Sequence, residues 1–130
     1  MRMMKVITVF LIITMSLCLA SCDYDPYEGK RPIDQPGSIW VCEEYQMKFT
    51  VGEFESSEFV TKNGTFHFQL LFGMYDNSVI VHEYDNYENQ FFNGSCKFSK
   101  DRFTIEVRQN ENSEVYFDEF PVTLIFKKVK

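Results

Sequence analysis

The chain has 130 residues and a formal net charge of −6, with 14 Phe, seven Tyr and one Trp. This length is that of a single domain. The negative charge argues against nucleic acid as a partner, because contacts with the phosphate backbone need a positively charged footprint. It also argues against electrostatic adhesion to anionic lipid head groups, so a membrane attachment would have to come from another feature of the chain.

The first 21 residues predict an export signal. Arg2 and Lys5 precede an uncharged, mostly apolar run of 15 residues, 6–20. That run is shorter than the roughly 20 residues of a membrane-spanning helix, and it fits the apolar region of about 7–15 residues in a cleaved signal. Ordinary secretion, with cleavage near Ser21, is the alternative to a signal that leads to lipid attachment.

The apolar run ends in Leu19-Ala20-Ser21-Cys22. This sequence resembles the lipobox of bacterial lipoproteins, in which an apolar residue and two small residues precede a cysteine. The resemblance implies that the Cys22 thiol receives a diacylglyceryl group and that cleavage makes Cys22 the new N-terminus. We therefore expect residues 1–21 to be removed as a signal peptide, and the chain to be held by lipid on the extracytoplasmic face of the cell membrane.

Residues 22–37 are expected to form the lipidated cysteine and a proline-rich tether, because Pro26, Pro32 and Pro36 interrupt regular structure there. The folded domain is predicted over residues 38–130. Without the signal, 11 bases and 19 acids remain, which gives a net charge of −8. This mature part has no Ala and little Leu but much Phe, Tyr, Val and Thr, a composition that favours strands over helices.

Alternation of apolar and polar residues predicts an all-β domain. The clearest pattern is the one of Phe103, Ile105 and Val107. Strands are predicted at residues 38–42, 45–51, 66–72, 79–84, 91–98, 103–107 and 122–126, with a weak one at 114–117. Asn63-Gly64 is a favoured pair for a type I′ hairpin turn. Seven or eight strands joined by short links favour a small antiparallel meander barrel, with a β-sandwich as the runner-up.

The parity of these strands predicts which side chains point into the domain. The predicted interior residues are Trp40, Phe68, Phe103, Ile105 and Phe126. Asn93-Gly94 suggests a β-bulge.

The segments Gly37-Ser38-Ile39-Trp40 and 94–101, GSCKFSKD, are similar to small uncharacterised lipoproteins of Gram-positive bacteria, and the layout of the domain resembles lipocalin-like barrels. This resemblance implies no particular activity.

Cysteines and histidines are few. A disulfide between Cys42 and Cys96 is chemically allowed outside the cytoplasm, but they fall on the first and about the fifth predicted strand, so two buried free thiols are the favoured alternative. His67 and His82 fall on neighbouring predicted strands. Their spacing matches no metal-ligand motif, so we expect neither a metal nor a cofactor.

Residues 84–92 combine tyrosines, amides and acids, as carbohydrate- and peptide-binding surfaces do. His82, Tyr84 and Tyr87 are therefore the candidate ligand-binding residues, with an ordinary hairpin loop as the alternative. The sequence contains no recognisable catalytic motif. We expect a non-catalytic binding or structural domain whose partner is an envelope protein, a peptide or a glycan. A carrier of a small apolar ligand inside the barrel is the alternative, and an enzyme of unknown class is the third choice.

Overall fold

The computed structural model describes residues 30–73 and 76–130. The predicted signal peptide, the Leu19-Ala20-Ser21-Cys22 motif and the first part of the predicted tether lie outside this part of the chain. The strands within it are β1 (Ile39–Cys42), β2 (Met47–Thr50), β3 (Glu58–Thr61), β4 (Gly64–Phe72), β5 (Ser78–Glu83), β6 (Asn86–Phe98), β7 (Arg102–Val107) and β8 (Val122–Lys128). Three short 3₁₀ helices accompany them: η1 (Pro32–Asp34), η2 (Phe54–Ser56) and η3 (Ser113–Val115).

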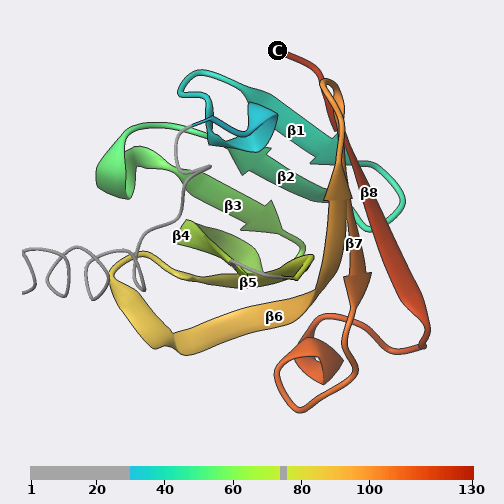
Figure 1. Ribbon diagram of the computed structural model, residues 1–130. Coiled ribbons are helices and arrows are strands. Elements are labelled where there is room, and N and C mark those ends of the chain that lie inside the picture. Colours follow the sequence, from blue (N-terminus) through green and yellow to red (C-terminus); the bar gives the residue numbers. More distant parts are fainter. Residues whose placement is uncertain (1–29, 74–75) are drawn as a thin grey trace, which may run out of the picture.

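The strands form a closed antiparallel meander barrel (Figure 1). Each strand pairs with the next one along the chain, and β8 returns to pair with β1. The closing contact sets Trp40 opposite Lys128 and Val41 opposite Lys127. The predicted fold class is therefore confirmed. Closure satisfies both edges of the sheet, which would otherwise present unpaired backbone groups to other chains.

The barrel interior is filled mainly by aromatic side chains. All five side chains predicted to lie inside, Trp40, Phe68, Phe103, Ile105 and Phe126, are buried. Phe49 lies at the centre of a ring cluster, with its centroid 4.7 Å from those of Phe59 and Phe68. The buried Trp40 indole donates a hydrogen bond of 2.9 Å to Ser38 Oγ, so its polar atom is satisfied as burial requires. Large rings on inward positions thus give a chain of this size a full core.

The meander gives the barrel two ends with different loops. One end, called the tether end below, carries η1, the β2–β3, β4–β5 and β6–β7 connections and the C-terminus. The other, called the far end, carries the β1–β2, β3–β4, β5–β6 and β7–β8 connections. Figure 1 shows the C-terminus and the β6–β7 turn at the top of the molecule and η3 at the bottom.

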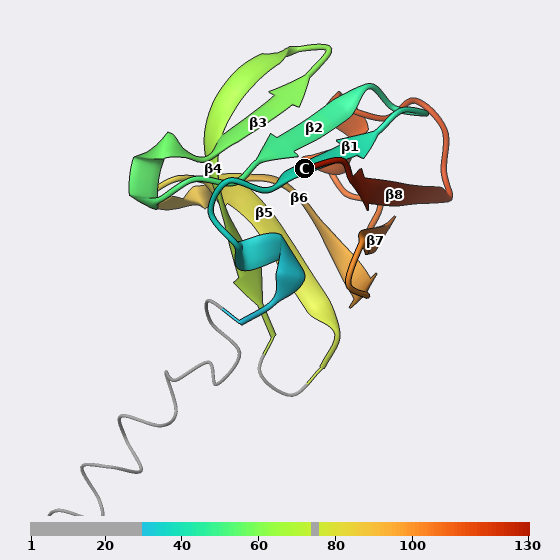
Figure 2. The ribbon, with the colours of Figure 1, turned by 90° about the horizontal axis from the view of Figure 1, so that it is seen from above.

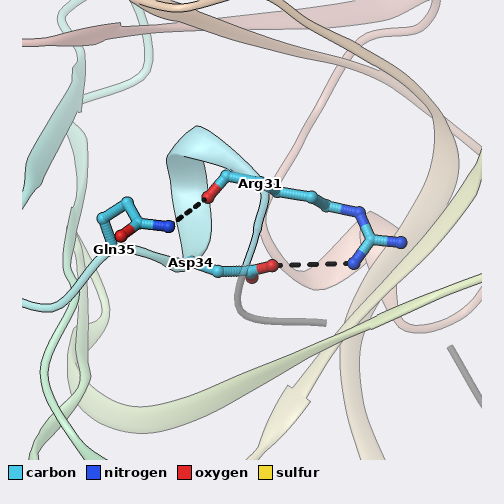
Figure 3. A network of polar contacts seen from close by, with 3 residues as sticks. All are labelled: Arg31, Asp34 and Gln35. Atoms are coloured by element: carbon cyan, nitrogen blue, oxygen red, sulfur yellow. Dashed lines mark hydrogen bonds and ion pairs between the residues drawn. The ribbon is translucent and has the colours of Figure 1, made fainter. Parts of the chain in front are cut away.

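Part of the predicted tether belongs to the folded domain. Ile33 in η1 is only 1% exposed and joins the core cluster. Arg31 is also buried, and its guanidinium carbon lies 3.9 Å from the centroid of the Phe72 ring. Arg31 Nη1 lies 3.6 Å from Asp34 Oδ2, and Gln35 Nε2 donates to the Arg31 carbonyl at 3.2 Å (Figure 3). The boundary predicted at residue 38 is therefore too late, because one isoleucine and one arginine anchor residues 31–35 on the barrel.

The β7–β8 connection closes the far end with a short helix where a weak strand was predicted. Residues 114–117 were expected to be extended, but η3 begins at Ser113. The Ser113 hydroxyl donates to the Arg108 carbonyl at 2.7 Å, while the Asn110 side chain accepts from Ser113 N at 3.0 Å. Such local hydrogen bonds compete with a sheet ladder. Phe117 follows and packs edge-on against Tyr45, with ring centroids 5.3 Å apart.

One strand and one turn differ from the prediction at the β3–β4 hairpin. β3 was not predicted, and it pairs with β4 through Thr61 opposite Gly64. The two residues of the turn are consequently Lys62 and Asn63, one position earlier than the predicted Asn63-Gly64 pair. Gly64 has φ +135°, a conformation that only glycine adopts readily.

In residues 30–73 and 76–130, no helix is long and apolar enough to cross a membrane.

Candidate functional site

A concavity runs across the outside of β5, β6, β7 and β8, and we call it the outer groove. Its volume is about 840 Å³, within the range of roughly 300–1,000 Å³ typical of ligand pockets. The side chains and backbone that line it belong to Asp76, Asn77, Ser78, Val79, Ile80, Asn93, Gly94, Ser95, Glu106, Val107, Arg108, Pro121, Val122 and Thr123.

Strand register explains why these side chains meet. Ser78 on β5 stands opposite Ser95 on β6, and Ser95 stands opposite Glu106 on β7. Glu106 in turn stands opposite Thr123 on β8. Because inward and outward positions alternate along a strand, these four polar residues form one row across the outer face, next to the inward row of valines. The row is the polar floor of the outer groove.

Gly94 shapes the groove where β6 passes β7. A Cβ added at this residue would lie 2.0 Å from the Glu106 carbonyl oxygen, so no side chain fits without a backbone shift. The pairing of Gly94 with Val79 and Val107 is regular, and the predicted bulge at Asn93-Gly94 is therefore wrong. The register shifts lie further along β5, on either side of His82. Glycine serves here for close approach of two backbones.

Charge in the groove is mixed. Asp76 Oδ1 accepts from both the backbone N and the Oγ of Ser78, at 3.1 and 2.5 Å. These two hydrogen bonds favour the charged form and lower the pKa of Asp76 below its ordinary value of 3.8. Ser95 Oγ donates to Glu106 Oε2 at 3.4 Å. Within residues 30–73 and 76–130, the exposed Arg108 makes no side-chain hydrogen bond or ion pair, so it supplies an uncommitted cation.

The groups that line the outer groove are arranged to form hydrogen bonds with a ligand more than to catalyse a reaction. Hydroxyls, amides, two carboxylates and one guanidinium line the groove, and all of these groups can donate or accept hydrogen bonds. Nucleophilic catalysis would need a serine within hydrogen-bond reach of a base. Neither His67 nor His82 lines the groove. In the described part of the chain, no group of three or more His, Cys, Asp or Glu is placed to hold a metal ion.

The structure brings together two of the three predicted ligand-binding residues. The rings of His82 and Tyr87 meet edge-on, with centroids 5.7 Å apart. His82 is buried, and its Nδ1 lies 2.8 Å from the Glu83 carbonyl oxygen. Tyr84 instead lines a small depression of about 360 Å³ beside His67 and Phe66. The three side chains therefore do not line a common groove, and their ligand-binding role stays a prediction.

The segment predicted to be a ligand loop is mostly strand. Tyr84 and Asp85 form the turn, and β6 begins at Asn86. Asp85 has φ 56°, a left-handed conformation that aspartate tolerates. The amides of this segment bond locally, since Asn89 Nδ2 donates to Glu83 Oε2 at 2.9 Å. The prediction missed this because mixed aromatic and amide residues are as typical of an exposed strand as of a loop.

The two cysteines lie on strands that do not pair with each other, whereas the two histidines lie on neighbouring strands. Cys42 on β1 and Cys96 on β6 are both buried free thiols, and burial raises the pKa of Cys96 to about 11. The prediction had placed Cys96 on the fifth strand, one strand too early, because β3 was not foreseen. His67 is exposed on β4, whereas His82 is buried on β5 opposite Gln69.

The barrel axis is occupied by rings at the level of Phe49. Its centroid lies 4.5 Å from that of Phe126, in addition to the contacts with Phe59 and Phe68. Phe92 closes the cluster toward the far end, 5.7 Å from Phe117. A carrier would need space along this axis, since an eight-stranded barrel either fills with side chains or holds one small ligand. The ring contacts favour filling.

Comparison with known proteins adds no relative. No protein-family model matches the chain, and no curated protein and no solved structure matches it either.

Proposed function

We propose that the protein is a lipid-anchored lipoprotein of the cell envelope whose barrel is a non-catalytic binding module. The observation that carries the proposal is the sequence Leu19-Ala20-Ser21-Cys22 at the end of a 15-residue apolar run. Lipid attached to Cys22 would hold the barrel on the extracytoplasmic face of the membrane. The resemblance to lipoboxes thus indicates where the protein is located, and we expect the surface of the barrel to bind its partner.

The position of η1 supports a short connection between anchor and barrel. Because Arg31 is held on the barrel by Phe72, only nine peptide steps separate Cys22 from the folded domain. At about 3.3–3.6 Å for each residue, these steps span at most roughly 30 Å. The barrel would therefore stay close to the membrane that holds it, closer than a tether extending to residue 37 would keep it.

The outer groove is the binding surface that the geometry supports best. It offers the Thr123 hydroxyl on β8 and the Arg108 guanidinium directly after β7, next to strands that are paired in a closed barrel. Sites on strands keep their geometry better than sites on loops. A peptide or a glycan of the envelope is the ligand class that this hydrogen-bonding surface fits.

Metabolic labelling with a radioactive fatty acid tests the anchor. Cys22→Ser should abolish incorporation of label into the protein, whereas Cys18→Ser, four residues earlier in the same apolar run, should retain it. Both variants remove one thiol from the signal region, so the pair separates acylation from general damage to export. Label retained by the Cys22→Ser protein would contradict the proposal.

Affinity capture from solubilised envelopes tests the groove. The variant Asn93→Leu/Thr123→Leu removes two polar groups from the groove, and Thr65→Leu on the outside of β4 is the matched control. We expect a ligand captured by the wild-type chain to be lost with the groove variant and kept with the control. Equal capture by all three proteins would exclude the groove as the binding surface.

A further inference from the structure

The charge of the molecule is unevenly distributed, in contrast to its net negative value. Two segments at the tether end, residues 97–102 and 127–130, contain six bases and one acid. The bases are Lys97, Lys100, Arg102, Lys127, Lys128 and Lys130, and all six are exposed. We call these two segments the basic edge. They carry a net charge of +5, while the chain as a whole carries −6.

Backbone pairing holds the two segments of the basic edge together. Arg102 on β7 stands directly opposite Lys127 on β8. Lys128 N donates to the Asp101 carbonyl at 2.8 Å, and Val129 N donates to the Ile39 carbonyl at the same distance. The six cations are therefore gathered by the sheet itself and not by flexible termini alone.

The cations of the basic edge lack compensation within the protein. Like charges directly opposite each other on neighbouring strands are destabilising, and Arg102 and Lys127 are such a pair. In residues 30–73 and 76–130, no ion pair joins any of the six bases to an acid. The helix η2, which contains Glu55, lies at the left of the molecule, away from the C-terminus and from β7 and β8 (Figures 1 and 2). An anionic partner would offset this local repulsion.

Apolar side chains are exposed among these cations. Phe98 follows Lys97 and is 46% exposed, and Val129 lies between Lys128 and Lys130 with 62% of its surface exposed. An apolar residue flanked by lysines is the pattern of a surface that lies at a lipid interface, where the rings and methyl groups enter the head-group region and the ammonium groups meet phosphate.

The basic edge also lies where the chain leaves the barrel toward Cys22. The Arg31 guanidinium rests on the Phe72 ring, and the Phe72 centroid is 6.2 Å from that of Phe98. One ring therefore separates the start of the tether from the basic edge. With roughly 30 Å of chain or less between Arg31 and Cys22, an anchor on Cys22 would present this end of the barrel to the membrane.

We propose that the basic edge binds an anionic lipid surface and orients the barrel with its tether end on the membrane. The inference rests on the proposed lipid anchor for its location, but the binding itself needs only the edge. The diacylglyceryl group would supply the attachment, and the basic edge would supply the orientation by electrostatic attraction to anionic head groups. The outer groove begins beside the β4–β5 connection at the tether end and reaches Pro121 and Thr123 at the far end, so this orientation would leave its β7 and β8 part away from the lipid.

Vesicle co-sedimentation with the unacylated chain tests the proposal separately from acylation. The protein is residues 22–130 with Cys22→Ser, which contains the whole described barrel and η1. The vesicles are phosphatidylcholine alone, or phosphatidylcholine and phosphatidylglycerol in equal amounts. We expect binding to the anionic vesicles only, and its loss when salt rises from about 0.1 M to about 1 M, because the Debye length shortens from about 10 Å to about 3 Å.

Charge variants locate the binding surface. Lys127→Glu changes the charge of the basic edge by two and should weaken binding by roughly 30-fold. The matched control, Lys62→Glu, makes the same charge change at the β3–β4 turn of the far end and should bind as the unsubstituted chain does within a few-fold. Phe98→Ser/Val129→Ser should weaken binding at unchanged charge.

Several outcomes would overturn the inference. Equal binding to both vesicle types, or to neither, would show that the edge does not recognise anionic lipid. Equal loss in Lys127→Glu and Lys62→Glu would show that net charge matters and not the edge. Sedimentation without vesicles would indicate self-association in place of lipid binding. None of these results depends on whether Cys22 is acylated in the cell, so the two proposals can fail independently.

Discussion

Truncation of Phe49 should destabilise the barrel more than truncation of an exposed phenylalanine in the same chain. Phe49 is fully buried, and its ring lies within 4.5–4.7 Å of three others, those of Phe59, Phe68 and Phe126. Replacing a buried Phe by Ala typically costs about 3–5 kcal/mol, because apolar contacts are lost and a cavity remains. Domains of this size are stable by roughly 5–15 kcal/mol, so Phe49→Ala should remove a large fraction of the stability.

Urea unfolding followed by tryptophan fluorescence measures this effect, since the chain has one Trp, the buried Trp40. With a denaturant slope of about 1.5 kcal/mol per molar urea, the midpoint should fall by roughly 2–3 M. Phe54, which is 76% exposed, is the control, and Phe54→Ala should change the stability by no more than about 0.5 kcal/mol. Equal shifts in the two variants would refute the aromatic core as described.

Three further predictions concern η1, a thiol and a carboxylate. Ile33→Ala should lower the free energy of unfolding by about 2–5 kcal/mol, whereas Ile125→Ala on the exposed face of β8 should have little effect. The Cys96 thiol, with its pKa raised to about 11 by burial, should resist alkylation by iodoacetamide near pH 8 until urea unfolds the chain. Ser78→Ala should raise the pKa of Asp76 in an NMR titration, because a hydrogen bond to the carboxylate is lost.

The lowered pKa of Asp76 determines the pH range in which its hydrogen bonds stabilise the folded state. The folded-state pKa lies below the ordinary value of 3.8, so the interaction stabilises the folded state above that value and is lost as the pH falls through the folded-state pKa. An unchanged Asp76 titration in Ser78→Ala would contradict the assigned hydrogen bonds. Rapid alkylation of Cys96 in the folded protein, or an Ile33→Ala variant as stable as Ile125→Ala, would contradict the burial of these two residues.

The barrel could be predicted because its evidence is local. Alternation on β7 identifies Phe103, Ile105 and Val107 as inward, and short links between such strands imply neighbours in one sheet. The predicted range of seven or eight strands includes the observed eight although two assignments were wrong. The strand expected at 114–117 is η3, and the four-residue strand β3 was missed. These two errors cancelled in the count.

The missed strand β3 and the misplaced tether boundary have physical causes that a local sequence pattern does not show. β3 is too short to show more than one full alternation, and its role depends on pairing with β2 and β4. Likewise Ile33 stands among prolines, and its burial comes from the barrel onto which η1 folds. Residues 22–37 were predicted to form a tether from their composition, which does not show the barrel surface against which residues 31–35 pack.

The outer groove and the basic edge show the same limit for sites. The outward positions of Ser95, Glu106 and Thr123 follow from alternation, but their alignment in one row depends on register across β6, β7 and β8. In the same way, a net charge of −6 concealed a local charge of +5, because residues 97–102 and 127–130 are far apart in sequence and adjacent in the barrel. The net charge of the whole chain argued against binding to an anionic lipid surface, whereas the local arrangement of cations favours it.

The account depends most on the fate of Cys22. Mass spectrometry of the protein purified from the envelope of its own cells tests this directly. The account predicts an N-terminal peptide that begins at Cys22 and carries a diacylglyceryl group, with residues 1–21 absent. An N-terminus at any other residue, or an unmodified Cys22 thiol, would contradict it.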